Sequence, residues 1–154
     1  MQRAGWRAIL VITAYTAGFI PGVPYPAQGA ERTAVKGIDV SLTTDQGAYA
    51  PGERVTFTLR VVNVTAKPVT LTFRTGQRFE LVIRNREGRE VWRWAAGRMF
   101  TQVLGNETIQ PSSELLYTAT LDQRLAPGVY IATGVVTARE GDLTAGAMVH
   151  VAPR

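Results

Sequence analysis

Short runs of alternating apolar and polar residues, separated by turn residues at intervals of about ten, dominate the sequence after residue 36. In the clearest run, residues 53–64, every second side chain from Val55 to Val61 is apolar, which is the period of a half-buried strand. At Val61-Val62 the apolar phase shifts, and this predicts a β-bulge. Further strands are predicted over 37–44, 69–74, 78–85, 90–94, 100–103, 114–121, 129–139 and 143–151.

Glycine-containing turns set the order of these strands. Pro51-Gly52 and Pro127-Gly128 each precede a strand, and Glu87-Gly88 predicts a hairpin tip that makes 78–85 and 90–94 antiparallel neighbours. Many short strands with one apolar face each are best buried as two packed sheets. The sequence therefore predicts an all-β fold, an immunoglobulin-like β-sandwich of about eight to nine antiparallel strands, with closure into a barrel as the alternative.

The first thirty residues have a different character. Arg3 and Arg7 precede the apolar stretch Ala8–Ile20, and small residues follow near Ala30, which is the layout of a secretory signal peptide. The apolar stretch is shorter than the roughly 20 residues that a membrane span needs, so no stable span is expected in the mature chain. We predict a signal peptide over 1–30, a short lead over 31–36 and one domain over 37–154. An exported protein, extracellular or in the cell envelope, follows from this prediction.

Charge and composition exclude some classes of partner but do not identify the partner. The chain has no cysteine and a formal net charge of +5, so packing rather than disulfides must hold the fold, and the mild basicity does not indicate a nucleic-acid partner. Arginines are densest between Arg74 and Arg98. Solvent-facing strand positions explain them, and a groove for an acidic polymer is the alternative, which the interspersed Glu80, Glu87 and Glu90 weaken.

The residues that carry catalysis are scarce. His150 is the only histidine, and alternation with Val149 and Val151 predicts that it faces solvent. No Gly-x-Ser-x-Gly elbow occurs, and the carboxylates are scattered rather than spaced as a calcium loop. We therefore expect a binding protein rather than an enzyme, without a metal or a cofactor.

Trp92 and Trp94 fall on one face of a predicted strand. If they are buried, each removes on the order of 200 Å² from water, which favours a core role. If they are exposed, two aligned indoles form a platform for sugars or another protein.

The region from Phe73 to Pro111 resembles the BsuPI family of intracellular proteinase inhibitors. The resemblance rests on Thr-Gly-Gln before an aromatic strand, on Val-Trp-Arg-Trp, and on the Phe-Thr-Gln that follows. It implies an immunoglobulin-like sandwich that blocks a subtilisin-like serine protease, and a structural role for the motif residues. These are Gly76, Gln77, Phe79, Trp92, Trp94 and Phe100.

An inhibitor needs a protruding, preorganised loop, since ordering a flexible one on binding lowers affinity. The candidate is Ala95-Ala96-Gly97-Arg98-Met99, between the tryptophan strand and Phe100; 75–78 and 122–127 are the other candidates. The alternative function is a non-inhibitory adhesion or accessory module of the cell envelope that binds a protein or a glycan.

Overall fold

The computed structural model describes residues 33–35 and 37–153, and this part of the chain contains strands and turns but no helix. The predicted signal peptide, 1–30, lies outside the described residues. Residues 33–35, within the predicted lead, form a short strand. The strands are β1 (Thr33–Val35), β2 (Ile38–Thr44), β3 (Thr56–Asn63), β4 (Val69–Phe73), β5 (Phe79–Arg84), β6 (Glu90–Arg93), β7 (Gly105–Ile109), β8 (Glu114–Thr120), β9 (Gly128–Val136) and β10 (Leu143–Val151).

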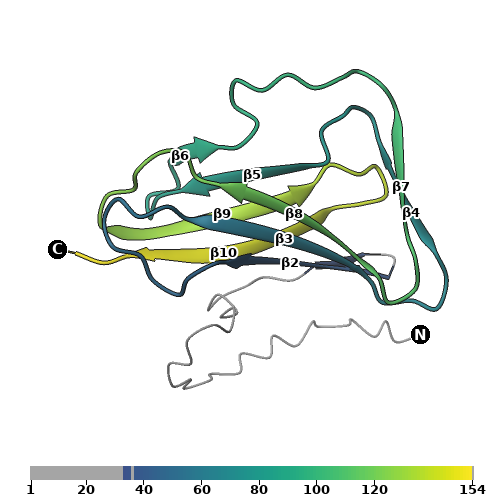
Figure 1. Cartoon of the computed structure of the whole chain (residues 1–154), viewed down its shortest axis with the longest axis horizontal. Coiled ribbons are helices and arrows are strands. Elements are labelled where there is room, and N and C mark those ends of the chain that lie inside the picture. Colours follow the sequence, from purple (N-terminus) through teal and green to yellow (C-terminus); the bar gives the residue numbers. More distant parts are fainter. Residues whose placement is uncertain (1–32, 36, 154) are drawn as a thin grey trace, which may run out of the picture.

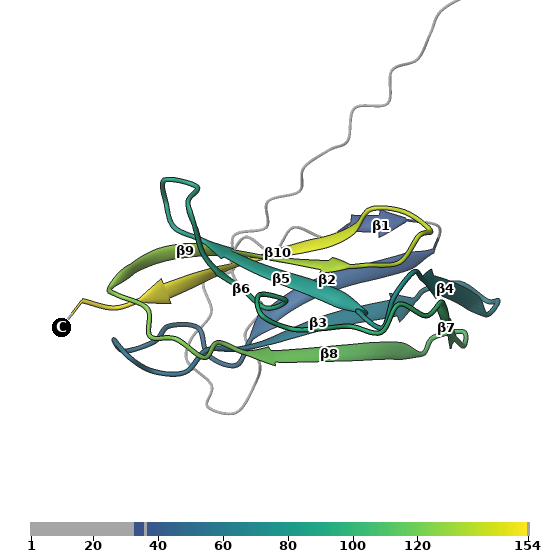
Figure 2. The ribbon, with the colours of Figure 1, turned by 90° about the horizontal axis from the view of Figure 1, so that it is seen from above.

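Two four-stranded sheets form the body of the molecule. One has the order β1-β2-β3-β8 and the other β10-β9-β5-β6, and every pairing within them is antiparallel. Figures 1 and 2 show them as two layers, with the small β4-β7 sheet standing across one end. The prediction of an antiparallel all-β sandwich is confirmed.

The core lies between the two layers, where every second residue of the central strands points inward. Phe57 and Leu59 from β3 and Ala132 from β9 belong to one cluster of apolar side chains, and all three are almost fully buried. The layers approach so closely at Gly134 that a Cβ there would lie 2.8 Å from Cδ1 of Leu59. Because real Cβ atoms do not come that close, any larger residue at this point of β9 would displace the buried side chain of Leu59.

A buried asparagine joins the β4-β7 sheet to the sandwich. The side chain of Asn63 at the end of β3 is fully buried, and its amide donates to the backbone carbonyls of Lys67 and Ile109 at 2.7 and 2.9 Å. Its carbonyl oxygen accepts from the backbone N–H and the hydroxyl of Thr65. All its polar atoms are therefore satisfied, as burial requires.

That asparagine also explains why the predicted bulge at Val61-Val62 is wrong. The pairing of β3 with β2 and β8 runs without interruption through both valines. The apolar phase shifts because Val62 is half-buried on the outer face and polar Asn63 is on the inner one. The register shift lies instead between Ile83 and Arg84, where β5 pairs with β6.

Two other local predictions have opposite outcomes. The hairpin tip is confirmed, since Gly88 has a φ of 79° and its N–H donates to Asn85 between the paired strands β5 and β6. The strand predicted over 100–103 is wrong, because these residues have no ladder partner. The strand of this region, β7, begins at Gly105, where it pairs with β4.

Candidate functional site

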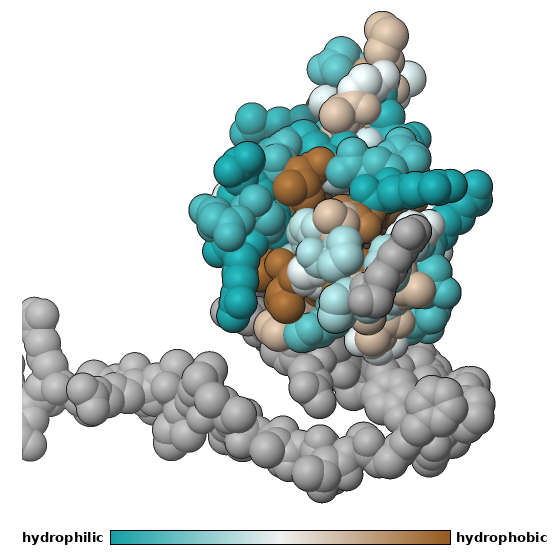
Figure 3. All heavy atoms as spheres, turned by 90° about the vertical axis from the view of Figure 1, so that its left-hand side faces the viewer, coloured by the Kyte–Doolittle hydropathy of each residue, from teal (hydrophilic) through white to brown (hydrophobic). Residues whose placement is uncertain are grey.

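The connection between β6 and β7, residues 94–104, is here called the β6–β7 segment. Figure 1 shows it crossing the upper edge of the molecule, from β6 to β7 at the opposite end. Seen from the left-hand side of that view, a mixture of moderately apolar, neutral and polar side chains projects at the top, and brown apolar patches lie among polar side chains below (Figure 3). The candidate loop 95–99 is the first part of this segment.

Two overlapping turns shape the start of the β6–β7 segment. The N–H of Ala96 donates to Arg93 at 3.2 Å and that of Arg98 to Ala95 at 3.1 Å. Gly97 has a φ of 73°, which glycine adopts more readily than other residues. The backbone N–H of Trp94 still donates to Leu81 of β5 at 2.9 Å, so the turns begin directly from the sheet.

Glu80 of β5 anchors the first turn to the sheet. Its Oε1 accepts from the backbone N–H of Ala95 at 3.1 Å, and its Oε2 pairs with the guanidinium of Arg93 at 3.3 Å. The Glu80 side chain is 15% exposed, so water competes little for these contacts. The carboxylate therefore fixes the point where the loop leaves β6.

A column of aromatic rings supports the segment. The rings of Phe79 and Trp94 stack with centroids 4.1 Å apart, and Phe100 lies 5.8 Å from Trp94. On the other side, Tyr117 of β8 stacks on Phe79 at 5.3 Å. Phe100 is therefore linked through three ring contacts to the opposite sheet of the sandwich.

A polar network closes the base of this column. The hydroxyl of Tyr117 donates to Glu107 at 3.2 Å, and Glu107 also accepts from Nε of Arg78 at 2.6 Å. Burial, and then the negative charge of Glu107, raise the pKa of Tyr117 above its ordinary value. The tyrosine thus stays protonated and able to donate across the neutral pH range.

Gly76 holds the second half of the segment. The N–H of Gly76 donates to the carbonyl of Thr101 at 2.8 Å, and a Cβ at Gly76 would lie 2.6 Å from the Thr101 hydroxyl. The bond from Gly76 fixes Thr101 directly after Phe100. Gln77 holds the neighbouring strand start instead: its side-chain amide donates to the carbonyl of Phe79 at 3.0 Å, and its backbone carbonyl accepts from the hydroxyl of Thr137 at 2.6 Å.

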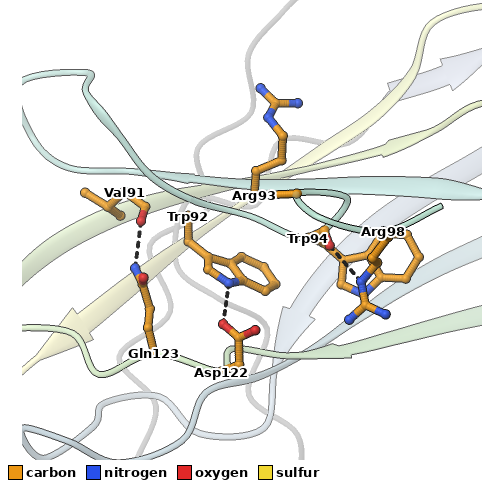
Figure 4. Close-up of a pocket in the computed structure, with 8 residues that line it drawn as sticks. Val91, Trp92, Arg93, Trp94, Arg98, Asp122 and Gln123 are labelled. Carbon is orange, nitrogen blue, oxygen red and sulfur yellow. Dashed lines mark hydrogen bonds between the residues drawn. The ribbon is translucent and has the colours of Figure 1, made fainter.

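Between these fixed points the side chains differ sharply in freedom. Met99 is 98% exposed, and Val103 and Leu104 are 67% and 68% exposed. Arg98 is held instead, since its guanidinium carbon lies 4.5 Å from the Trp94 ring centroid and its Nε donates to the Trp94 carbonyl at 2.8 Å (Figure 4). The segment therefore presents apolar groups, because its cation is turned back onto the protein.

A shallow hollow lies beside the segment, between β6 and the connection from β8 to β9 (Figure 4). The indole N–H of Trp92 donates to Asp122 at 2.7 Å, and the amide of Gln123 donates to the carbonyl of Val91 at 2.6 Å. Trp92 and Trp94 are both half-buried and pack against the core. Neither indole is thus a fully exposed stacking surface.

The remaining sequence candidates do not join this site. His150 is exposed on β10, as predicted. Arg78 and Arg93 pair with glutamates, so part of the arginine-rich region is neutralised locally. Among residues 33–35 and 37–153, no three metal-ligating side chains of the His, Cys, Asp and Glu type come together. The described part of the chain also contains no helix long and apolar enough to cross a membrane.

Sequence reasoning named the loop 122–127 but missed what its first residues and Glu80 do. Contacts across the fold give Glu80, Asp122 and Gln123 their roles. The adjacent apolar residues Val103 and Leu104 could have indicated an exposed apolar surface. The sequence instead predicts a strand over 100–103, and a strand would bury one of its faces.

Comparison with known families identifies the class of protein. The family model described as BsuPI, intracellular proteinase inhibitor, matches residues 42–141. This match covers more than half of the chain, so the protein belongs to the BsuPI family of intracellular proteinase inhibitors. Membership supports an inhibitor function with a proteinase as partner, and a binding role rather than an enzymatic one.

Two solved structures are similar to this chain, and the first of them supports the fold. The C-terminal domain of wzt is 12% identical, with a TM-score of 0.53 over 86% of this chain and 83% of that one. Spo0M, a sporulation control protein from Bacillus subtilis, is 20% identical, with a TM-score of 0.48 over 78% of this chain and 51% of that one. This chain thus spans about half the length of Spo0M. Curated proteins give no significant match.

One sequence-based prediction is corrected here. The apolar N-terminal stretch predicted an exported protein, extracellular or in the cell envelope. The family to which the chain belongs is described as intracellular, which contradicts that location. The composition of the first thirty residues was therefore a poor guide to where the protein acts.

Proposed function

We propose that this protein inhibits a subtilisin-type serine protease, and that the loop Ala95–Met99 of the β6–β7 segment enters the active-site cleft. Membership of a proteinase inhibitor family supports the class of partner. The observation that carries the choice of loop is the combination of a fixed backbone with the almost complete exposure of Met99. The serine protease class comes from the family resemblance.

Rigidity supports the proposal because an inhibitory loop must be ordered before it binds. Hydrogen bonds from Ala96 and Arg98 close two turns, and Glu80 and the aromatic column hold both sides. The loop therefore has little conformational entropy left to lose in a complex. This order is reached without any disulfide, since the chain has no cysteine.

The two other loops named from sequence have their side chains committed to the fold. In 75–78, Gln77 and Arg78 bind Phe79 and Glu107. In 122–127, Asp122 and Gln123 bind β6, and Leu125 is buried. Neither loop leaves a large apolar side chain as free as Met99.

Titration of purified subtilisin with the full chain tests the proposal, with residual peptidase activity as the readout. We expect activity to fall toward zero near an equimolar ratio. Replacing Met99 by Asp should raise the inhibition constant by about tenfold or more, because a charge would be desolvated in the complex. Arg86→Ala, on the exposed β5–β6 hairpin, is the control and should inhibit like the parent chain.

Two results would contradict the proposal. In the first, the protease degrades the chain and keeps its full activity. In the second, the chain forms a stable complex while the protease still turns over a small chromogenic substrate. The second result would favour the non-inhibitory binding module, and a captured glycan or other protein ligand would then define its partner.

A further inference from the structure

We infer that Met99 is the side chain that fills the primary specificity pocket of the protease, so the partner is an endopeptidase that cleaves after large apolar residues. This inference rests on the proposed function and adds the selectivity that the loop encodes. It depends on which side chain of the β6–β7 segment can leave the protein's own surface.

Arg98 is the obvious competitor, because a cation would select a protease with an acid at the base of its pocket. Its guanidinium lies 4.5 Å from the ring centroid of Trp94, and its Nε donates to the Trp94 carbonyl at 2.8 Å. Entering a pocket would break both contacts and uncover Trp94. The structure therefore uses Arg98 to brace the turn.

Phe100 is the competitor on the other side of Met99. Its ring is half-buried and lies 5.8 Å from the centroid of Trp94, which in turn stacks on Phe79. Withdrawing this ring would undo the end of the aromatic column. Met99 thus sits between two neighbours that are held down, while it is itself 98% exposed.

The backbone on both sides of Met99 is fixed independently. The N–H of Arg98 is bonded to Ala95 on one side, and the carbonyl of Thr101 is bonded to Gly76 on the other. A single free side chain on a backbone fixed at both ends has the geometry that insertion into a pocket requires. Methionine is also unbranched and polarizable, so it fills a deep apolar pocket without a strict shape requirement.

Val103 and Leu104 form a second exposed apolar group, four residues further along. Leu104 adjoins β7, which pairs with β4 at the end of the sandwich. We assign Leu104 a contact with the protease outside the primary specificity pocket. Leu104 is therefore a matched control for Met99, since both are exposed apolar side chains of the same segment.

The experiment measures inhibition constants of three variants of the full chain against subtilisin. Met99→Leu should stay within about threefold of the parent chain, because an apolar pocket accepts either side chain. Met99→Asp should be weaker by about a hundredfold, since a carboxylate would be buried without a partner. Leu104→Asp should change the constant by less than about tenfold, because a contact at the rim of an interface stays hydrated. Urea unfolding curves check that all three remain folded.

A parallel measurement with trypsin tests whether Arg98 fills the specificity pocket, because the pocket of trypsin selects cations. We expect the parent chain to leave trypsin active. Inhibition of trypsin that is lost in Arg98→Ala would overturn the inference and assign the pocket to Arg98.

The outcomes separate this inference from the proposed function. If the parent chain inhibits subtilisin while Met99→Asp is as potent as the parent, the assignment of Met99 to the pocket and of the loop Ala95–Met99 to the cleft is overturned, and inhibition of a subtilisin-type protease stands. The same holds if Leu104→Asp has the larger effect. If the parent chain inhibits no protease, the proposed function is wrong and this inference falls with it.

Discussion

Two connections between strands of this sandwich lack ladder pairing, yet they are built in opposite ways. The β8–β9 segment, residues 121–127, packs against the sandwich through its side chains. Leu121 and Leu125 are buried, and Asp122 accepts a hydrogen bond from Trp92. The β6–β7 segment is held at its backbone and at Phe100, and it leaves Met99 almost fully exposed.

This difference shows that absence of secondary structure is not what marks a binding surface. The β8–β9 segment buries Leu121 and Leu125, whereas the β6–β7 segment leaves Met99, Val103 and Leu104 exposed. Exposed apolar groups on an ordered backbone point to a partner, because a fold gains nothing from them by itself. Substitutions in the two segments should therefore differ in whether they lower stability or binding.

The largest effect is expected for Leu125→Ala in the β8–β9 segment. Leu125 is 6% exposed and belongs to the core, so removing its side chain should lower the free energy of unfolding by about 2 to 5 kcal/mol. Urea unfolding monitored by tryptophan fluorescence measures the loss. Leu104→Ala, at the 68% exposed leucine of the other segment, should change it by less than about 0.5 kcal/mol. Equal losses would remove the distinction between the segments.

Asp122→Ala should have the next largest effect. It removes the acceptor of the half-buried Trp92 indole N–H, a hydrogen bond of 2.7 Å to an exposed carboxylate, and should destabilise the fold by about 0.5 to 1 kcal/mol. A double-mutant cycle with Trp92→Phe checks the origin of the loss. The two substitutions should be clearly non-additive, and additive losses would mean that this bond contributes nothing to stability.

Gly76→Ala should affect the β6–β7 segment from outside it. The added Cβ would lie 2.6 Å from the Thr101 hydroxyl, so the hydroxyl or the segment must shift, at a stability loss of about 0.5 to 1 kcal/mol. The loss in free energy of binding to the protease should exceed the loss in free energy of unfolding, because the backbone beside Met99 is displaced. Adding Thr101→Ala removes the clash and should restore inhibition; a double variant as weak as Gly76→Ala would show that the contact is irrelevant.

The smallest stability effect is expected for Met99→Ala. A side chain that is 98% exposed buries almost nothing, so the free energy of unfolding should stay within about 0.5 kcal/mol of the parent value. Thermal and urea unfolding both measure this. A loss above about 1 kcal/mol would show that Met99 packs against the protein in solution, which is incompatible with a free binding side chain.

The sequence predicted the sandwich well because alternation reports directly on burial. In 53–64 the period of two placed Phe57 and Leu59 inward, where the structure has them. It failed where burial depends on a distant partner. Val62 and Asn63 looked like a bulge because a buried asparagine with four hydrogen bonds leaves no trace in an apolar pattern.

The site was less accessible to such reasoning. The position between the predicted tryptophan strand and Phe100 indicated a loop at 95–99, and turns lie there. Whether Arg98 or Met99 is the free side chain depends on the aromatic ring beneath Arg98, which periodicity cannot reveal. The strand predicted over 100–103 failed for a related reason, because strand propensity forms a strand only where another strand is available to pair.

The β4-β7 sheet gives the β6–β7 segment a property that a hairpin loop lacks. A hairpin returns to its own neighbour, whereas this segment starts on the main sheet at β6 and finishes on a separate two-stranded sheet (Figure 1). Its span is therefore set by how those two bodies are joined, in part through Asn63. Inserting a residue between Thr101 and Leu104 lengthens the segment without changing Met99, and deleting one shortens it. The length of the segment relative to the distance between β6 and β7 can therefore be changed independently of its side chains.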